Sequence, residues 1–274
     1  MSTQLLESKT GPSAAKRVER DYLSYSAVRA YQQCPLRYFF RYVAGLPEKT
    51  VAASLMFGSA IHRGLEFYFR QSLEGGSEPS LAELLHEYRL GWEERDLPIR
   101  FRKDEQIGSF DPLAERMLTA FLQNDLAQPR GQILAVEETL RGPVIPGLPE
   151  LLGRVDLILE TPDELIIRDW KTSRSRYTQD QVDESASQLL LYGELAQTFA
   201  PGKAIRLELA VLTKTKEVSI DQHSFLLEQV PLIRTKRIVE RVWQAIQEEH
   251  FYPAPSQMNC MGCPYKTPCQ KWPG

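Results

Sequence analysis

Two aspartates and a lysine stand in neighbouring apolar segments near the middle of the chain. Asp156 lies within the segment 151–159, and Asp169 and Lys171 end the next one. Side chains alternate along a strand, so Asp169 and Lys171 are expected on the same face. The turn-forming residues 160–164 predict a hairpin that brings Asp156 beside them. Carboxylates can hold Mg²⁺ or Mn²⁺ and a lysine can offset charge on a phosphate, so this group favours metal-dependent phosphodiester hydrolysis.

A histidine lies upstream of these acids on a predicted helix. Residues 56–69 repeat large apolar side chains every four positions, which predicts a buried helix. Gly58 and Gly64 are costly inside a helix, so another segment is expected to pack closely there. His62 lies beside these small residues. A lone histidine in such a helix is usually a satisfied core residue, and only the later acids make it a candidate metal ligand.

Two further features follow Lys171. Residues 172–177 form a polar, basic segment that suits contact with a phosphate backbone, although ordinary surface turns have a similar composition. Residues 183–199 predict an amphipathic helix, on which Gln188 and Tyr192 share one face because they are four positions apart.

The four cysteines form a second pattern that points to a metal. Cys260, Cys263 and Cys269 lie within ten residues, and Cys34 stands alone near the start, before Pro35. Four thiolates can bind zinc or an iron–sulfur cluster, and four unrelated thiols are the plainer alternative. The prolines around the last three cysteines predict that this segment is not helical. A metal held by all four would clasp the two ends of the chain.

Composition narrows the class of protein. The chain has 274 residues, 42% of them hydrophobic, and a net charge of −3. This charge gives no global basic field of the kind that many nucleic-acid-binding proteins carry, so any contact with DNA must use local clusters. No signal peptide and no apolar run long enough to span a membrane are evident. We therefore expect a cytoplasmic protein, in which disulfides are rare.

The order of helical and strand-like patterns predicts an α/β fold with a mixed central sheet flanked by helices. Residues 1–20 lack periodicity and are expected to form a disordered tail, followed by a single domain over 21–274. A helix is expected to start at residues 21–24. Residues 81–128 predict a helical insertion, and residues 259–270 predict the cysteine-bearing C-terminal segment.

Taken together, these motifs resemble those of a known family. Gly58-x-x-x-His62, Gly153-x-x-Asp156, Asp169-x-Lys171 and Gln188-x-x-x-Tyr192 follow one another in the order typical of the RecB-like branch of the PD-(D/E)xK nuclease superfamily. The cysteine pattern is similar to that of its iron–sulfur members, which include the AddB nuclease domain and CRISPR-associated RecB-like exonucleases. The resemblance extends over residues 24–269.

The resemblance implies a role for each matching residue. His62, Asp156 and Asp169 would be metal ligands, assisted by the Trp170 carbonyl, and Lys171 would be the catalytic lysine. Gln188 and Tyr192 would organise the site or contact DNA. A glutamate on the preceding strand is also implied, for which Glu137 is slightly favoured over Glu138. Four residues would hold a structural [4Fe–4S] cluster: Cys34, Cys260, Cys263 and Cys269.

The same resemblance implies a restriction-endonuclease-like core and a Mg²⁺- or Mn²⁺-dependent deoxyribonuclease. The expected activity is exonucleolytic hydrolysis of single-stranded DNA ends in repair or recombination, with a helicase or repair protein as a possible partner and no membrane. The alternatives are an exonuclease of CRISPR adaptation, an inactive iron–sulfur DNA-binding subunit and a zinc-bearing adaptor. The motif acids and Lys171 argue against an inactive subunit, which would be free to lose them.

Overall fold

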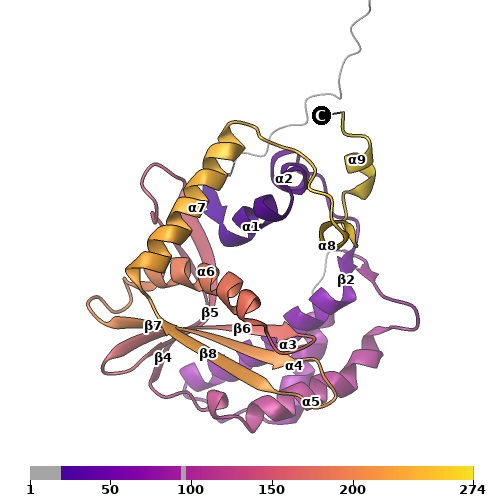
Figure 1. Ribbon diagram of the computed structural model, residues 1–274. Coiled ribbons are helices and arrows are strands. Elements are labelled where there is room, and N and C mark those ends of the chain that lie inside the picture. The colour runs from indigo at the N-terminus through magenta and orange to yellow at the C-terminus, as the bar shows by residue number, and fades with distance from the viewer. Residues whose placement is uncertain (1–19, 94–96, 274) are drawn as a thin grey trace, which may run out of the picture.

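A mixed β-sheet forms the middle layer of the protein. The computed structural model describes residues 20–93 and 97–273, so all but the last residue of the expected tail 1–20 lies outside the described part. The sheet has six strands in the main order β1-β5-β6-β7-β8, with β4 paired to β5 (Figure 1). The strands are β1 (Tyr22–Ser24), β4 (Gln132–Gly142), β5 (Glu150–Glu160), β6 (Glu164–Ser173), β7 (Ala204–Thr213) and β8 (Ile220–Leu226).

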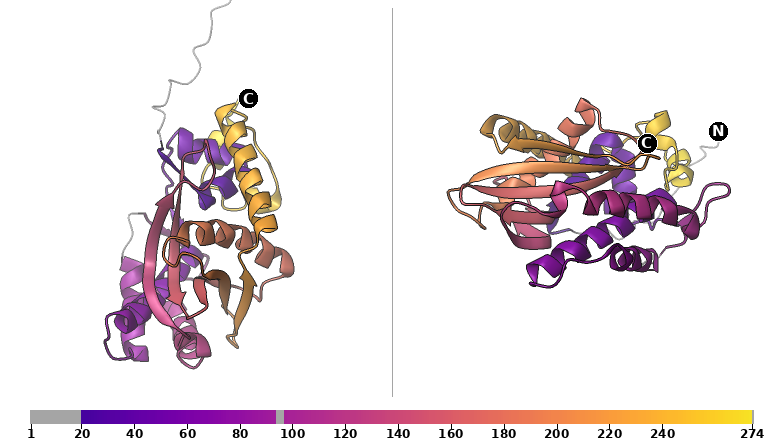
Figure 2. Two further views of the ribbon diagram at one scale, coloured as in Figure 1. Left: turned by 90° about the vertical axis from the view of Figure 1, so that its left-hand side faces the viewer. Right: turned by 90° about the horizontal axis from the view of Figure 1, so that it is seen from below.

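Helices cover both faces of this sheet, as the side view in Figure 2 shows. One face carries α3 (Ala53–Leu73), α4 (Leu81–Glu93) and α5 (Asp111–Leu122). The other carries α1 (Tyr25–Gln33), α6 (Gln179–Ala196) and α7 (Gln229–Gln247). Each helical layer has its own apolar core against the sheet. The expectation of a mixed sheet flanked by helices is confirmed.

The predicted hairpin between the two motif strands is also confirmed. β5 and β6 are antiparallel, and Glu160 pairs with Leu165 around the short turn. β6 and β7 are parallel and are connected through α6. Thr178 begins α6 with a capping box that it shares with Gln181. These connections place the ends of β5 and β6 beside the helix that carries Gln188.

Several boundaries differ from the sequence-based expectation. Residues 22–24 form β1, which pairs in parallel with β5, and the helix starts only after Ser24, whose hydroxyl accepts the Ala27 N–H. A three-residue strand has too little pattern of its own, because its partner lies far away in sequence. The segment 81–128 holds, besides α4 and α5, two 3₁₀-helices (Ile107–Phe110 and Asp125–Ala127) and β3 (Ile99–Arg100), which pairs with β2 (Val51–Ala52).

The C-terminal segment was expected to be non-helical, and this expectation is wrong. It contains two short helices, α8 (Gln257–Cys260) and α9 (Lys266–Gln270). Ser256 caps α8 by accepting the Asn259 N–H at 3.0 Å. Pro268 lies in the first turn of α9, where a missing N–H costs no helical hydrogen bond. Prolines therefore shorten these helices without preventing them.

The two ends of the described chain lie side by side. α2 (Pro35–Tyr38) and the π-helical turn Phe39–Val43 follow α1 and lie next to the C-terminal segment in Figure 1. The Leu36 N–H donates to the Tyr252 carbonyl at 2.9 Å, and the Tyr265 hydroxyl donates to the Leu46 carbonyl at 3.1 Å. Leu36, Phe40 and Tyr265 form a third, smaller apolar cluster between them. Across residues 20–93 and 97–273, no helix is long and apolar enough to cross a membrane.

The packing of α3 on α4 gives a test of this fold. A Cβ added at Gly91 of α4 would lie 2.9 Å from the Ala60 Cα of α3, closer than real contacts allow. We expect Gly91→Ala to lower the free energy of unfolding by roughly 1–3 kcal/mol because the two backbones must move apart. Gly108→Ala is the matched control, since nothing lies within 4 Å of the added methyl group. Equal stability of the two variants in urea denaturation would contradict the described packing.

Candidate active site

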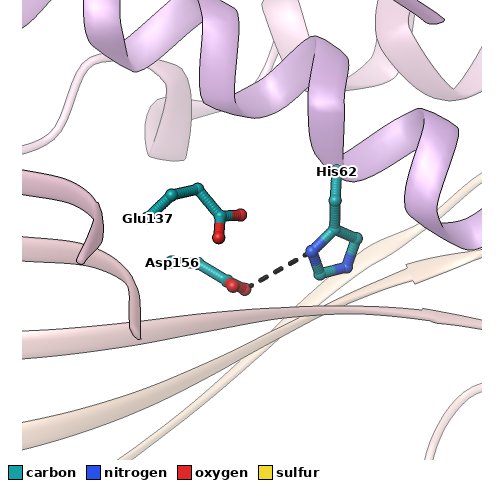
Figure 3. A group of neighbouring side chains, drawn as sticks. All are labelled: His62, Glu137 and Asp156. Atoms are coloured by element: carbon teal, nitrogen blue, oxygen red, sulfur yellow. Dashed lines mark ion pairs between the residues drawn. The ribbon is translucent and has the colours of Figure 1, made fainter. Parts of the chain in front are cut away.

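A histidine and two carboxylates from three elements converge beside the middle of strands β4 and β5. His62 of α3, Glu137 of β4 and Asp156 of β5 each offer a ligand atom, and these atoms all lie within 4.8 Å of one another. Figure 3 shows the His62 ring pointing from its helix toward both carboxylates. Its Nδ1 lies 3.6 Å from the Asp156 Oδ2. Imidazole nitrogen and carboxylate oxygens are suitable donors for a divalent cation.

The sheet is distorted where Glu137 and Asp156 lie. Residues two apart on a regular strand share a face. In β5, however, Val155 packs in the core under α6, whereas Leu157 packs in the core under α3. Glu137 has a φ of 53°, a left-handed conformation that is rare for a residue with a Cβ. Such strain is typical of functional sites, and at Glu137 it lies next to the ligand atoms of Asp156 and His62.

The same part of β5 lacks a backbone partner on one side. β1 pairs with residues 150–152 and β6 pairs with residues 157–160 along that side, so the pairings described for them leave 153–156 open. The Asp156 carboxylate accepts the Trp170 N–H at 2.7 Å. A side chain therefore replaces the strand-to-strand hydrogen bond at this point. The contact fixes Asp156 next to the Asp169–Trp170–Lys171 segment that the sequence singled out.

Asp169 and Lys171 share a face, as predicted, and form an ion pair with 2.7 Å between the Nζ and Oδ2 atoms. Lys171 Nζ also lies 3.4 Å from the Gln188 Oε1, and the Gln188 amide donates to the Tyr192 hydroxyl at 3.0 Å. These contacts form one chain from β6 into α6. Asp169 lies outside the tight group of three ligands. The recorded contact of Trp170 is through its N–H, and its indole ring is buried between Phe69 and Phe121.

Burial of these charges shifts their protonation. The pKa of Glu137 is raised from 4.5 to about 7, first by burial and then by the charge of Asp156. The pKa of Asp156 is raised as well, mainly by burial, with His62 opposing the shift. Burial alone would lower the pKa of Lys171, but the carboxylates of Asp169 and Asp156 outweigh it and raise the pKa above its ordinary value. The buried carboxylates therefore create a negative electrostatic potential around Asp156, and this potential attracts a cation.

The glycines of the predicted motifs permit close approach of other elements. A Cβ at Gly153 would lie 2.4 Å from the Tyr192 ring, so glycine is needed for α6 to pack on β5 at this level. A Cβ at Gly58 would lie 3.0 Å from the Thr172 hydroxyl, which explains how the first half of α3 reaches the end of β6. These two glycines thus set the distance between the helices and the strands that carry the acids.

A cavity of about 940 Å³ opens over this group. It includes His62, Glu137, Asp156 and Lys171, whereas Glu138 is exposed on the strand. Sequence reasoning missed several charged residues that also line it: Arg63, Glu66, Arg154 and Lys214. Glu66 follows His62 by four positions on α3, and this spacing was the one signal that could have identified it. Arg154 forms an ion pair with Glu137, a contact that depends on strand register.

The four cysteines gather at the joined ends of the chain, away from the carboxylates. Burial raises the pKa of the Cys269 thiol, and the charges of Cys34, Cys263 and Cys260 add to the shift. The Asn259 amide donates to the Gln33 carbonyl at 2.6 Å and so ties α8 to the residue before Cys34. All four are free thiols. The structure therefore brings together the four residues that the sequence pattern grouped.

Two solved structures resemble this chain at low sequence identity. A candidate exonuclease from Eubacterium rectale is 16% identical, with a TM-score of 0.43 and coverage of 80% of this chain and 88% of its own. The protein SSO0001 is 14% identical, with a TM-score of 0.39 and coverage of 90% and 95%, respectively. Among curated proteins, no sequence matches this chain.

The sequence model of one family matches nearly the whole chain. That family is the PD-(D/E)XK nuclease superfamily, and the match extends over residues 22–270. This range contains the complete sheet, the His62–Glu137–Asp156 group, the Asp169–Lys171 pair and all four cysteines. The chain belongs to the PD-(D/E)XK nuclease superfamily.

Proposed function

We propose that the protein is a Mg²⁺- or Mn²⁺-dependent deoxyribonuclease of the RecB-like branch, acting as an exonuclease on single-stranded ends. Membership in the superfamily makes it a hydrolase of phosphodiester bonds whose relatives use divalent metals. The observation that carries the proposal is the convergence of His62, Glu137 and Asp156 in one cavity with Lys171, which is paired with the buried Asp169. The preference for single-stranded ends, and a setting in repair or recombination, rest on the resemblance of the ordered motifs.

The donor set fits a hard divalent cation. Two carboxylates and one imidazole offer oxygen and nitrogen ligands, and burial, together with the charge of the neighbouring acids, raises the pKa values of Glu137 and Asp156. Asp169 would act as a further ligand or would hold Lys171 in position. A bound cation would polarise the scissile phosphate and favour ionisation of a water molecule.

The residues of the chain itself supply orientation and charge. Asp169 and Gln188 hold the Lys171 ammonium between them, and Tyr192 fixes the Gln188 amide. A lysine held in this way keeps its proton and can donate to a phosphate oxygen as negative charge builds there. Its raised pKa makes Lys171 a poor general base at neutral pH. We therefore assign electrostatic stabilisation of the phosphate to Lys171.

We further propose that the four cysteines hold a structural [4Fe–4S] cluster. The donor set suits this group, since four thiols from both ends of the chain meet beside Leu36, Phe40 and Tyr265. Arg37 Nε and the Trp272 indole N–H are buried there without a hydrogen-bond partner among the described residues, and anionic sulfur would accept such donors. Zinc is the alternative for the same four thiolates.

Digestion of DNA tests the proposed activity. We expect the wild type to degrade linear single-stranded DNA with Mn²⁺ or Mg²⁺ and to leave a circular single strand intact. Asp156→Asn should lower the rate by at least about 100-fold, because a neutral amide replaces a charged carboxylate in the ligand group. Asp163→Asn, in the exposed β5–β6 turn, is the matched control. Equal rates for Asp156→Asn and the wild type would refute the site, and rapid cleavage of the circle would refute end dependence.

The raised pKa of Glu137 predicts a pH-dependent cost in the metal-free protein. An acid whose pKa is raised by folding destabilises the folded state as the pH rises from its unfolded pKa through its folded pKa, here from about 4.5 to about 7. We expect Glu137→Gln to stabilise the chelator-treated protein by roughly 1–3 kcal/mol at pH 8 and hardly at all at pH 4. Glu138→Gln is the control, because Glu138 is exposed. Denaturation curves in which both variants behave alike at pH 8 would contradict the assignment.

Removal of one cysteine tests the cluster. Cys34 and Cys260 are 226 positions apart, so a group that joins them removes much entropy from the unfolded chain. We expect anaerobically purified Cys34→Ser to lose iron and to lose about 4 kcal/mol of stability, or more, by the logic that applies to disulfides. Iron analysis and thermal denaturation measure both. A variant that loses iron and keeps full stability would refute the structural role of the cluster. Zinc in place of iron in the wild-type protein would refute the cluster itself.

A further inference from the structure

Lys214 lies on the wall of the active-site cavity, in the turn between β7 and β8. Its ammonium donates to the Ser54 carbonyl at 3.2 Å and lies 5.1 Å from the centre of the Phe57 ring. The Lys214 N–H donates to the Ser173 carbonyl, which ties this turn to the end of β6. Both ends of the residue are therefore fixed, one on the first turns of α3 and the other on the strand that carries Lys171.

The surroundings of this lysine are poor in negative charge. Within residues 20–93 and 97–273, no carboxylate forms an ion pair with Lys214 or with the neighbouring Arg174, which lines the same cavity. Burial lowers the pKa of Lys214 to about 8, and the charge of Arg174 contributes to the shift. Two cations held close together, one of them partly buried, are unfavourable unless an anion joins them.

We propose that Lys214 and Arg174 form a binding subsite for a backbone phosphate of the nucleic-acid strand, next to the phosphate that is cleaved. This inference rests on the proposed nuclease function and extends it. The wall of the cavity carries the candidate metal ligands Glu137 and Asp156 and also the cations Lys171, Arg174 and Lys214. A strand whose cleaved phosphate is held by a cation at Glu137 and Asp156 would present a neighbouring phosphate to Lys214 and Arg174.

The residues that hold Lys214 suit this role. The Ser54 carbonyl accepts one of the three ammonium protons, and the ammonium lies over the Phe57 ring at the cavity wall. The remaining protons are free to donate to phosphate oxygens. Arg174, on the exposed loop after β6, can move to meet the same phosphate. A lysine that served only to tie the β7–β8 turn to α3 would need no neighbouring arginine and no cavity.

The experiment compares binding of single-stranded DNA, without divalent metal, by the wild type and Lys214 variants over a range of salt concentrations. We expect Lys214→Met to bind about tenfold more weakly, the loss of one charge-assisted hydrogen bond. The slope of log affinity against log salt should fall by about 0.7, the value for one phosphate contact on a single strand. Lys214→Arg should retain most of the affinity and the slope. Lys216→Met is the matched control, because Lys216 is exposed in the same turn and does not line this cavity.

A second measurement assigns the contact to one phosphate. Oligonucleotides that carry a single neutral methylphosphonate linkage, moved one position at a time, should show one linkage whose neutralisation weakens the wild type and leaves Lys214→Met unaffected. If Lys214→Met does not fold, the same scan on Arg174→Gln, a change in an exposed loop, tests the subsite in its place. Inorganic phosphate could instead compete with the DNA at millimolar concentration while no methylphosphonate position has a specific effect. That result would show a site for the free anion and would overturn the assignment to a backbone phosphate.

The outcomes separate this inference from the proposed function. If Lys214→Met binds DNA with the same affinity and the same salt slope as the wild type, the subsite is refuted, whatever the nuclease assay gives. If Lys214→Met binds more weakly but with an unchanged slope, Lys214 has a structural role and the subsite is refuted as well. A position-specific effect in a protein that cleaves no DNA with Mn²⁺ or Mg²⁺ would support the subsite while refuting the nuclease proposal.

Discussion

The rest of the site depends on one constraint. Three carboxylates, those of Glu137, Asp156 and Asp169, carry negative charge in a partly buried place. Carboxylates this close repel one another, and burial removes the water that would screen them. Lys171 neutralises part of this charge through Asp169, and the Trp170 N–H and His62 offset part of the charge on Asp156. Burial, and after it the charge of Asp156, raises the pKa of Glu137 to about 7, although Arg154 opposes the shift. A divalent cation bound by His62, Glu137 and Asp156 would remove this cost and would account for the donor set.

The sheet and its helices are arranged to hold this charge in place. β1 and β6 leave one side of β5 open next to Asp156, and both β4 and β5 change face at the level of the site. Gly58 and Gly153 let α3 and α6 approach closely from opposite faces of the sheet. At the other end of the molecule, contacts between α1–α2 and the C-terminal segment close the chain around the cysteines. The proposed cluster would strengthen a closure that hydrogen bonds and the Leu36–Phe40–Tyr265 group already make.

Local patterns in the sequence predicted the layers and the neighbourhood of the site. The alternation in β5 and β6 placed Asp169 beside Lys171, and the spacing of Gln188 and Tyr192 placed both on one face of α6. What the sequence could not give depends on contacts between distant segments: the pairing of β1 with β5, the left-handed Glu137, and the approach of Lys214 to Ser54. Glu137 and Glu138 look alike in the sequence, and only the distorted strand separates the buried residue from the exposed one.

Binding of Mn²⁺ to the metal-free protein tests the central claim most directly. Pulsed electron paramagnetic resonance detects a nitrogen ligand of bound Mn²⁺, and titration gives the affinity. We predict that the wild type binds Mn²⁺ with nitrogen coupling from one imidazole, and that His62→Gln loses this coupling. Asp156→Asn should bind at least tenfold more weakly. Tight binding without nitrogen coupling, or equal affinity in Asp156→Asn, would contradict a metal centre at His62, Glu137 and Asp156.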